Sequence, residues 1–122
     1  MAKVTCGVFP ARAEGWNLEL LEMMACNKPV ITTNYSAHTE FCTEENSLLI
    51  PIEDVEKASD DKFFSNATGN WAKITDKEIS ILSSLMKKVH EEGIVDNPAG
   101  VETAKQFSWK NSAKKILEIL NV

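Results

Sequence analysis

The chain has 122 residues, and its 13 Lys and Arg against 18 Asp and Glu give a formal net charge of −5. This length holds one domain at most, and the acidic balance excludes general nucleic-acid binding, which requires a concentrated basic face. A hydrophobic content of 43% excludes intrinsic disorder, and no apolar run approaches the roughly 20 residues that span a bilayer.

The first half of the chain predicts strands around one helix. Residues 4–9 are apolar on both faces, which is typical of a strand buried in a parallel sheet. Asn17 is a good N-cap residue for a helix over 18–25. We expect that helix to bury the face made by Leu18, Leu21, Glu22 and Ala25. Residues 29–34 and 47–52 predict two further strands, at spacings that allow parallel crossover connections.

The second half of the chain predicts helices. Residues 53–73 are polar and mixed, and we expect a loop or irregular insertion that packs back through its aromatic residues. Thr75 and Glu78 have the spacing of a capping box, which opens a long helix. A short helix is expected over 98–107, and Ser108 caps a last one with Ala113, Ile116, Leu117 and Leu120 in register. The predicted class is α/β, with a parallel sheet of about three strands, flanking helices and a helical C-terminus.

Cysteine usage agrees with a reducing compartment. Cys6, Cys26 and Cys42 lack metal-type spacing such as C-x-x-C. Each lies in or beside an apolar segment, where a free thiol packs as a small hydrophobic group, so we interpret all three as reduced and structural. With no basic-then-apolar leader, the expected location is the cytoplasm. His38 and His90 stand apart from other ligand types, so polar or surface roles are expected rather than metal binding.

The chemistry is expected in the segment after the first predicted strand. Open α/β sheets bind ligands at the carboxyl ends of their strands. The free backbone amides of residues 15–18, at a helix start, form a seat for a phosphate or other anion. Glu14 and Glu22 bracket this seat; we expect Glu22 to point toward the body of the domain, and a carboxylate suits paired sugar hydroxyls. The alternative is an unused helix start, because acidic residues also favour the helix dipole.

Four ordered segments carry a family resemblance. The first is Glu14 and Glu22 with seven residues between them, preceded by Phe9-Pro10 and followed by residues 25–31. The others are residues 33–40, residues 44–52, and Phe107-Ser108-Trp109 followed by Ala113. Together they resemble the retaining glycosyltransferases of group 1, family 4, which have the GT-B architecture, use nucleotide sugars and carry an E-x7-E motif.

The resemblance implies a role for each matched residue. Glu14 corresponds to the first Glu, which faces the transferred sugar and is the catalytic candidate. Glu22 corresponds to the second Glu, which binds the ribose hydroxyls. The remaining binding candidates are Gly15, Trp16, Asn17 and Leu18, with a UDP-, GDP- or ADP-sugar as donor substrate and neither a cofactor nor a metal. Trp16-Asn17 stands where Phe-Gly is commoner, and Asn27 replaces the usual Gly after the helix.

The resemblance also implies that residues 1–122 are one partial domain with a partial Rossmann-like sheet, the later part of the donor-binding C-terminal domain of such an enzyme. The acceptor-binding domain, and the Arg/Lys pair that neutralises the leaving diphosphate, would lie in a missing N-terminal part. We therefore expect no useful transfer by this chain alone. Strand 4–9 would expose an unpaired edge, which predicts a homodimer joined edge to edge or by swapped elements.

The leading interpretation is a donor-binding fragment of a retaining hexosyltransferase that acts on a sugar, lipid or protein acceptor. The full-length enzyme is expected in the cytoplasm, free or peripheral to the membrane. The alternative is a non-catalytic α/β interaction module that self-associates, and nucleotide-sugar binding that depends on Glu22 distinguishes the two. A different α/β enzyme is disfavoured, because the sequence contains no P-loop, G-x-G-x-x-G or C-x-x-C motif.

Overall fold

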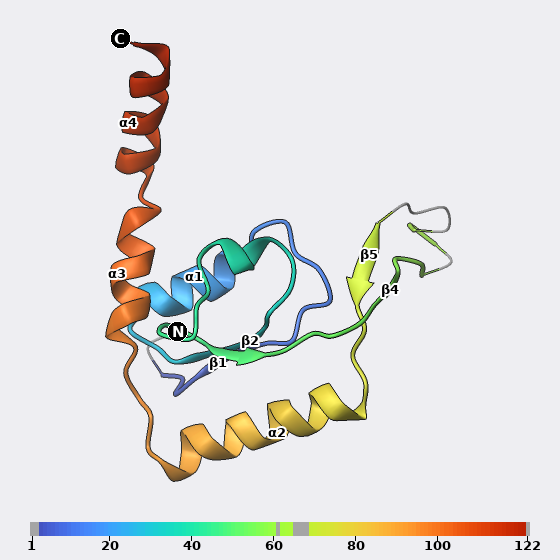
Figure 1. Ribbon diagram of the computed structural model, residues 1–122. Coiled ribbons are helices and arrows are strands. Elements are labelled where there is room, and N and C mark those ends of the chain that lie inside the picture. Colours follow the sequence, from blue (N-terminus) through green and yellow to red (C-terminus); the bar gives the residue numbers. More distant parts are fainter. Residues whose placement is uncertain (1–2, 61, 65–68, 122) are drawn as a thin grey trace.

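A computed structural model describes residues 3–60, 62–64 and 69–121. At its centre, a three-stranded parallel sheet has the order β1-β2-β3 (Figure 1). The strands are β1 (Gly7–Phe9), β2 (Val30–Thr33) and β3 (Leu48–Ile50). Each is shorter than its predicted run, and every residue of the central strand β2 is buried. The predicted fold class, α/β with a partial Rossmann-like parallel sheet and flanking helices, is confirmed.

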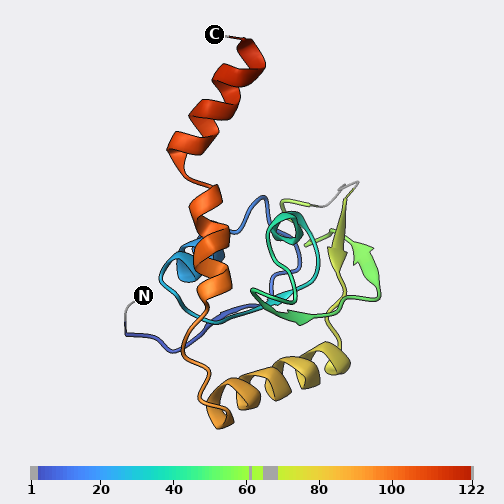
Figure 2. The same cartoon turned by 60° about the vertical axis from the view of Figure 1, so that its left-hand side comes forward.

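Helices cover both faces of the sheet. Helix α1 (Leu18–Ala25) lies on one face with α3 (Pro98–Gln106) packed against it, and α2 (Asp76–Glu91) lies on the other (Figures 1 and 2). Neighbouring residues of a strand point to opposite faces, so Val30 and Ile31 belong to different cores. Val30 packs in a cluster with Leu20, Met23, Met24, Phe41 and Cys42. Ile31 packs with Ile50 and Val89.

Helix α1 has the predicted bounds but buries a different face. Its buried residues are Leu20, Met23 and Met24, whereas Leu18 is 62% exposed. Glu22 is also exposed, so the expectation that its carboxylate points toward the body of the domain is wrong. The reason is that α1 is apolar on two stripes, and the longer, more flexible methionine side chains fill the space above the sheet.

Both ends of α1 have left-handed backbone. Asn27 has φ of 57°, as expected for a residue that ends a helix. Asn17 is the N-cap residue of α1, as predicted, but its φ is 66° and its side chain makes no capping hydrogen bond. A left-handed conformation at Asn17 explains why a glycine would also suit this position.

Two more strands lie in the segment predicted as a loop or irregular insertion. Strands β4 (Val55–Lys57) and β5 (Asn70–Ala72) pair antiparallel and form a small separate sheet. The backbone amide of Lys73 donates to the carbonyl of Asp54 at 3.0 Å, so the two ends of this unit meet. We call residues 54–73 the hairpin unit. The hairpin unit lies beside the carboxyl end of the three parallel strands (Figure 1).

The predicted capping box opens α2. The Thr75 amide donates to a carboxylate oxygen of Glu78 at 2.8 Å, and the Thr75 hydroxyl donates to the same oxygen. The Thr75 hydroxyl also accepts a hydrogen bond from the backbone amide of Lys77. These bonds from Thr75, led by its hydroxyl, lower the pKa of Glu78 below its ordinary value.

This capping box predicts a loss of stability in acid. A carboxyl group whose pKa is lower in the folded than in the unfolded chain stabilises fully above the unfolded value, near 4.5. That contribution is lost as the pH falls through the lower folded value. We expect the melting temperature of Glu78→Gln to fall less between pH 6 and pH 3 than that of the wild type. Glu91→Gln, an exposed change on the same helix, is the control, and equal acid slopes in both variants would contradict the assignment.

The C-terminal helix extends away from the rest of the molecule. Helix α4 (Trp109–Leu120) begins at the predicted cap, where the Ser108 hydroxyl accepts from the amide of Asn111. Both views show it projecting from the body (Figures 1 and 2). Its apolar residues Ile116, Leu117 and Leu120 are in register, and each is at least half exposed. Across the described ranges, no helix combines the length and apolar character needed to cross a membrane.

The three cysteines are free thiols in different surroundings. Burial raises the pKa of Cys6 and that of Cys42, which makes both thiols less reactive. Cys26 is exposed, so the expectation of a buried, structural role is wrong for this residue. It lies at the C-cap of α1, where the backbone turns away from the core.

Candidate functional site

The predicted site residues lie on the loop that joins β1 to α1. The loop leaves the sheet at the carboxyl end of β1 and returns as α1, so the helix start lies at this edge. Glu14, Gly15 and Leu18 are exposed, and the spacing of four residues places Glu22 over Leu18 on the solvent side of α1. A carbon added to Gly15 would meet no atom within 4 Å. Two exposed carboxylates thus lie near the start of α1 in the chain, Glu14 before it and Glu22 in its second turn.

Trp16 and Asn17 are instead held against the protein. The ring of Trp16 lies 5.2 Å from that of Phe41 and 5.3 Å from that of Phe107, and this aromatic trio joins the site loop to the start of α4. Asn17 is buried, and its side-chain nitrogen has no hydrogen-bond partner among the described residues. The backbone amides of these residues, rather than their side chains, fit the predicted anion seat.

Hydroxyl groups at the end of β2 fix the start of the loop. Thr32 donates to the carbonyl of Phe9 at 3.1 Å, and Thr33 donates to the carbonyl of Ala11 at 2.6 Å. Neither threonine was among the predicted site residues. Two threonines at the carboxyl end of a central strand were the available signal, because their buried hydroxyls require partners.

His38 contacts the same end of β2. It lies in the 3-10 helix Ala37–Glu40 and is fully buried, so of the expected polar or surface roles this histidine has the polar one. Its Nε2 lies 2.6 Å from the carbonyl oxygen of Thr33 and 3.1 Å from the Thr32 hydroxyl. Nε2 therefore carries a proton and donates it to the carbonyl. His90, by contrast, is exposed on α2.

Arg12 joins the site loop to the hairpin unit. Its guanidinium lies 4.5 Å from the centre of the Trp71 ring and pairs with Glu56. Its Nε donates to the carbonyl of Ala72, and the Ala72 amide donates to the carbonyl of Arg12 at 2.8 Å. Tyr35 adds a hydrogen bond to the carbonyl of Asn70 at 3.1 Å. The hairpin unit is thereby attached to both loops of the site edge.

This attachment predicts that replacing Arg12 lowers stability more than replacing Glu56. Arg12→Ala removes a cation–π contact and a hydrogen bond, and we expect the free energy of unfolding to fall by about 1–2 kcal/mol. Glu56→Gln removes only a half-exposed ion pair and should cost less than about 0.5 kcal/mol. Urea denaturation of both variants measures the difference. Equal losses would mean that the ion pair, rather than the stacking on Trp71, holds the hairpin unit.

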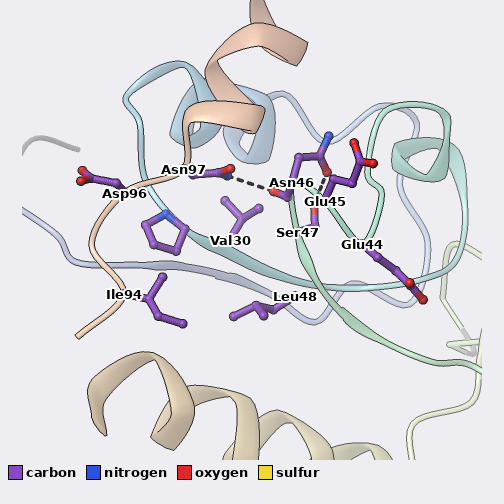
Figure 3. A pocket seen from close by; sticks show the side chains of 10 residues that line it. Val30, Glu44, Glu45, Asn46, Ser47, Leu48, Ile94, Asp96 and Asn97 are labelled. Atoms are coloured by element: carbon purple, nitrogen blue, oxygen red, sulfur yellow. Dashed lines mark hydrogen bonds between the residues drawn. The ribbon is translucent and has the colours of Figure 1, made fainter. Parts of the chain in front are cut away.

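The cavity shown in Figure 3 lies at the opposite edge of the sheet, where β2 and β3 begin at Val30 and Leu48. Its volume is about 130 Å³, which is below the range of roughly 300–1,000 Å³ for small-molecule sites. Asn97 on its wall donates to the carbonyl of Asn46 at 2.9 Å. We assign this cavity to the packing of the segment between α2 and α3 beside the starts of β2 and β3, and not to the predicted site. Across residues 3–60, 62–64 and 69–121, no three His, Cys, Asp or Glu side chains are grouped to hold a metal ion.

A parallel sheet with helices on both faces and a loop-to-helix junction at its carboxyl edge defines an α/β protein with a partial Rossmann-like fold. Residues 1–61 match the family model described as "Glycosyl transferases group 1". The match covers 61 of the 122 residues, and the chain belongs to this family. The matched range includes β1, the segment from Glu14 to Glu22, β2 and β3. Comparison with curated proteins and with solved structures gave no match.

Proposed function

We propose that this chain is the nucleotide-sugar-binding part of a retaining hexosyltransferase of the GT-B architecture. Glu14 faces the transferred sugar, and Glu22 binds the ribose hydroxyls of a UDP-, GDP- or ADP-sugar. The amides of Gly15, Trp16, Asn17 and Leu18 bind the diphosphate. The reaction needs no metal or cofactor, and the acceptor is a sugar, lipid or protein.

One observation supports this proposal above the others. Within the half of the chain that matches the glycosyltransferase family, Glu14 and Glu22 are exposed on either side of the start of α1. Free amides at a helix start attract a diphosphate, and ionised carboxylates accept hydrogen bonds from sugar hydroxyls. The outward direction of Glu22 favours this role, because an exposed carboxylate is open to a ligand and keeps its solvation until the ligand binds.

Transfer of the sugar requires more than this surface. The leaving diphosphate develops negative charge, which positively charged groups must stabilise. Arg12, the cation nearest in sequence to Glu14, is paired with Glu56 and stacked on Trp71. We therefore propose that this chain binds the donor without transferring its sugar. The rest of the enzyme supplies the cations and the acceptor site. The full-length enzyme is placed by this proposal in the cytoplasm.

Calorimetric titration of the chain with UDP-glucose, GDP-glucose and ADP-glucose tests the proposal. We expect one of the three to bind in the absence of metal and to remain intact after incubation. No binding of any of the three would overturn the proposed donor site. Hydrolysis or transfer of the glucose would overturn the proposed lack of activity.

A second candidate, a self-associating interaction module, is favoured by the exposed apolar face of α4 and by the edge position of β1. The Gly7 amide donates to the carbonyl of Pro29, so in a parallel ladder the backbone groups of Val8 point away from β2. We propose that this edge joins two copies of the chain. Sedimentation at rising concentration measures the association, and a monomer at the highest concentration counts against it.

A further inference from the structure

Ser36 contacts the backbone of Glu14 twice. Its hydroxyl oxygen accepts a hydrogen bond from the amide of Glu14 at 3.0 Å and donates one to the carbonyl of the same residue at 2.8 Å. The two residues are 22 positions apart, one on the loop after β1 and one on the loop after β2. A single side chain thus satisfies both polar backbone groups of the catalytic candidate.

The backbone of Ser36 is in a region that favours glycine. Its φ is 73° and its ψ is −164°, a combination that side chains with a Cβ atom rarely adopt and that clusters at functional sites. Thr39 holds this conformation, because its hydroxyl donates to the carbonyl of Ser36 at 2.7 Å and its amide donates to the same carbonyl at 3.1 Å. A glycine would fit this backbone without strain. What a serine adds here is the hydroxyl, and both of its hydrogen bonds go to Glu14.

Other contacts fix the loop on either side of Glu14, and the nearest after it is at Trp16, whose ring packs against Phe41 and Phe107. The bonds from Thr33 and from Ala72 hold the carbonyls of Ala11 and Arg12. Gly15, directly after Glu14, is exposed and has open space around it. Ser36 therefore holds the loop at the point where the predicted catalytic carboxylate leaves the backbone.

We propose that Ser36 is a positioning residue that sets the place of Glu14 at the donor site. The role of Glu14 at a donor site rests on the proposed function. The contact between Ser36 and Glu14 can be tested without it. It implies that the strained backbone of Ser36 lowers stability while its hydroxyl keeps the Glu14 loop ordered.

The test compares Ser36→Gly with Ser36→Ala in the full chain. Both variants lose the hydroxyl, but only glycine relieves the backbone strain, so we expect Ser36→Gly to melt about 5 °C above Ser36→Ala. Hydrogen exchange of the Glu14 amide should be about tenfold faster than the wild type in both variants. Ser84→Ala removes a serine hydroxyl from the exposed surface of α2 and is the control, with wild-type exchange at Glu14.

Ligand binding separates this role from general damage to the fold. We expect both Ser36 variants to have about tenfold lower affinity than the wild type for whichever of the three glucose nucleotides binds the wild type. Both should bind the matching nucleoside diphosphate, which lacks the sugar that faces Glu14, nearly as the wild type does. Wild-type exchange at Glu14 in both variants, or equal weakening of the two ligands, would overturn the inference. If the wild type binds no nucleotide sugar, the proposed function fails, while the exchange rates still decide whether Ser36 holds Glu14.

Discussion

Asn97→Ala is expected to lower the free energy of unfolding by about 3 kcal/mol. The Asn97 side chain is buried and caps α3, where its oxygen accepts from the Gly100 amide at 2.9 Å. Its nitrogen donates to the carbonyl of Lys28 at 3.2 Å and to that of Asn46 at 2.9 Å (Figure 3). Alanine removes the hydrogen-bond partner of the Gly100 amide and of two carbonyls, at a position where the Asn97 side chain is buried.

Asn111→Ala is the matched control for this prediction. Asn111 also donates to two carbonyls, those of Lys105 and Gln106, but it is exposed at the start of α4. Water replaces its hydrogen bonds, so we expect a loss of about 0.5 kcal/mol or less. Urea denaturation of the two variants measures both values. A loss at Asn97 as small as that at Asn111 would show that the hydrogen bonds from the start of α3 to the loops before β2 and β3 add little to stability.

Glu22→Gln is expected to weaken binding of the donor nucleotide sugar by about tenfold to a hundredfold. The estimate follows from the loss of charged hydrogen bonds to the ribose, worth about 1.5–3 kcal/mol together. Glu22 is exposed and on the solvent side of α1, so the melting temperature of the variant should stay close to that of the wild type. Calorimetric titration with the glucose nucleotide that suits the wild type gives the measurement.

Glu19→Gln provides the control on the same helix. Glu19 is exposed in the first turn of α1, where its charge favours the helix dipole, but it lies outside the pair with seven intervening residues. Its replacement should change donor affinity less than about threefold, because only a screened long-range charge is lost. Equal losses of donor affinity in the two variants would mean that the net charge of α1, rather than a hydrogen bond to Glu22, determines the affinity.

Local signals predicted the helices well. The bounds of α1, the capping box of α2 and the cap of α4 each depend on residues a few positions apart. Such short-range preferences act before any tertiary contact forms, so the sequence carries them directly. The order of the three sheet strands was also predictable, because consecutive parallel strands with crossover connections lie side by side more often than not.

Features that depend on distant partners were not predictable. The face that α1 buries depends on the sheet beneath it, because apolar residues lie all along this helix. The hairpin unit has strands of three residues with little burial of their own, and it is attached through Arg12, 60 positions before Ala72. Ser36 gave no signal either, because serine has no preference for positive φ and its hydroxyl reaches Glu14 only in the folded chain.

The attachments of the loop between β1 and α1 have a consequence for how fast a ligand binds. Hydroxyls of Thr32, Thr33 and Ser36 and the amide of Ala72 hold its backbone through hydrogen bonds within the protein itself. The conformational entropy of this loop is thus lost when the protein folds rather than when the donor arrives. If the proposed donor site is correct, we expect binding to this preorganised surface to be a single encounter with no loop closure after it, at a rate set by diffusion and by the charge of the nucleotide.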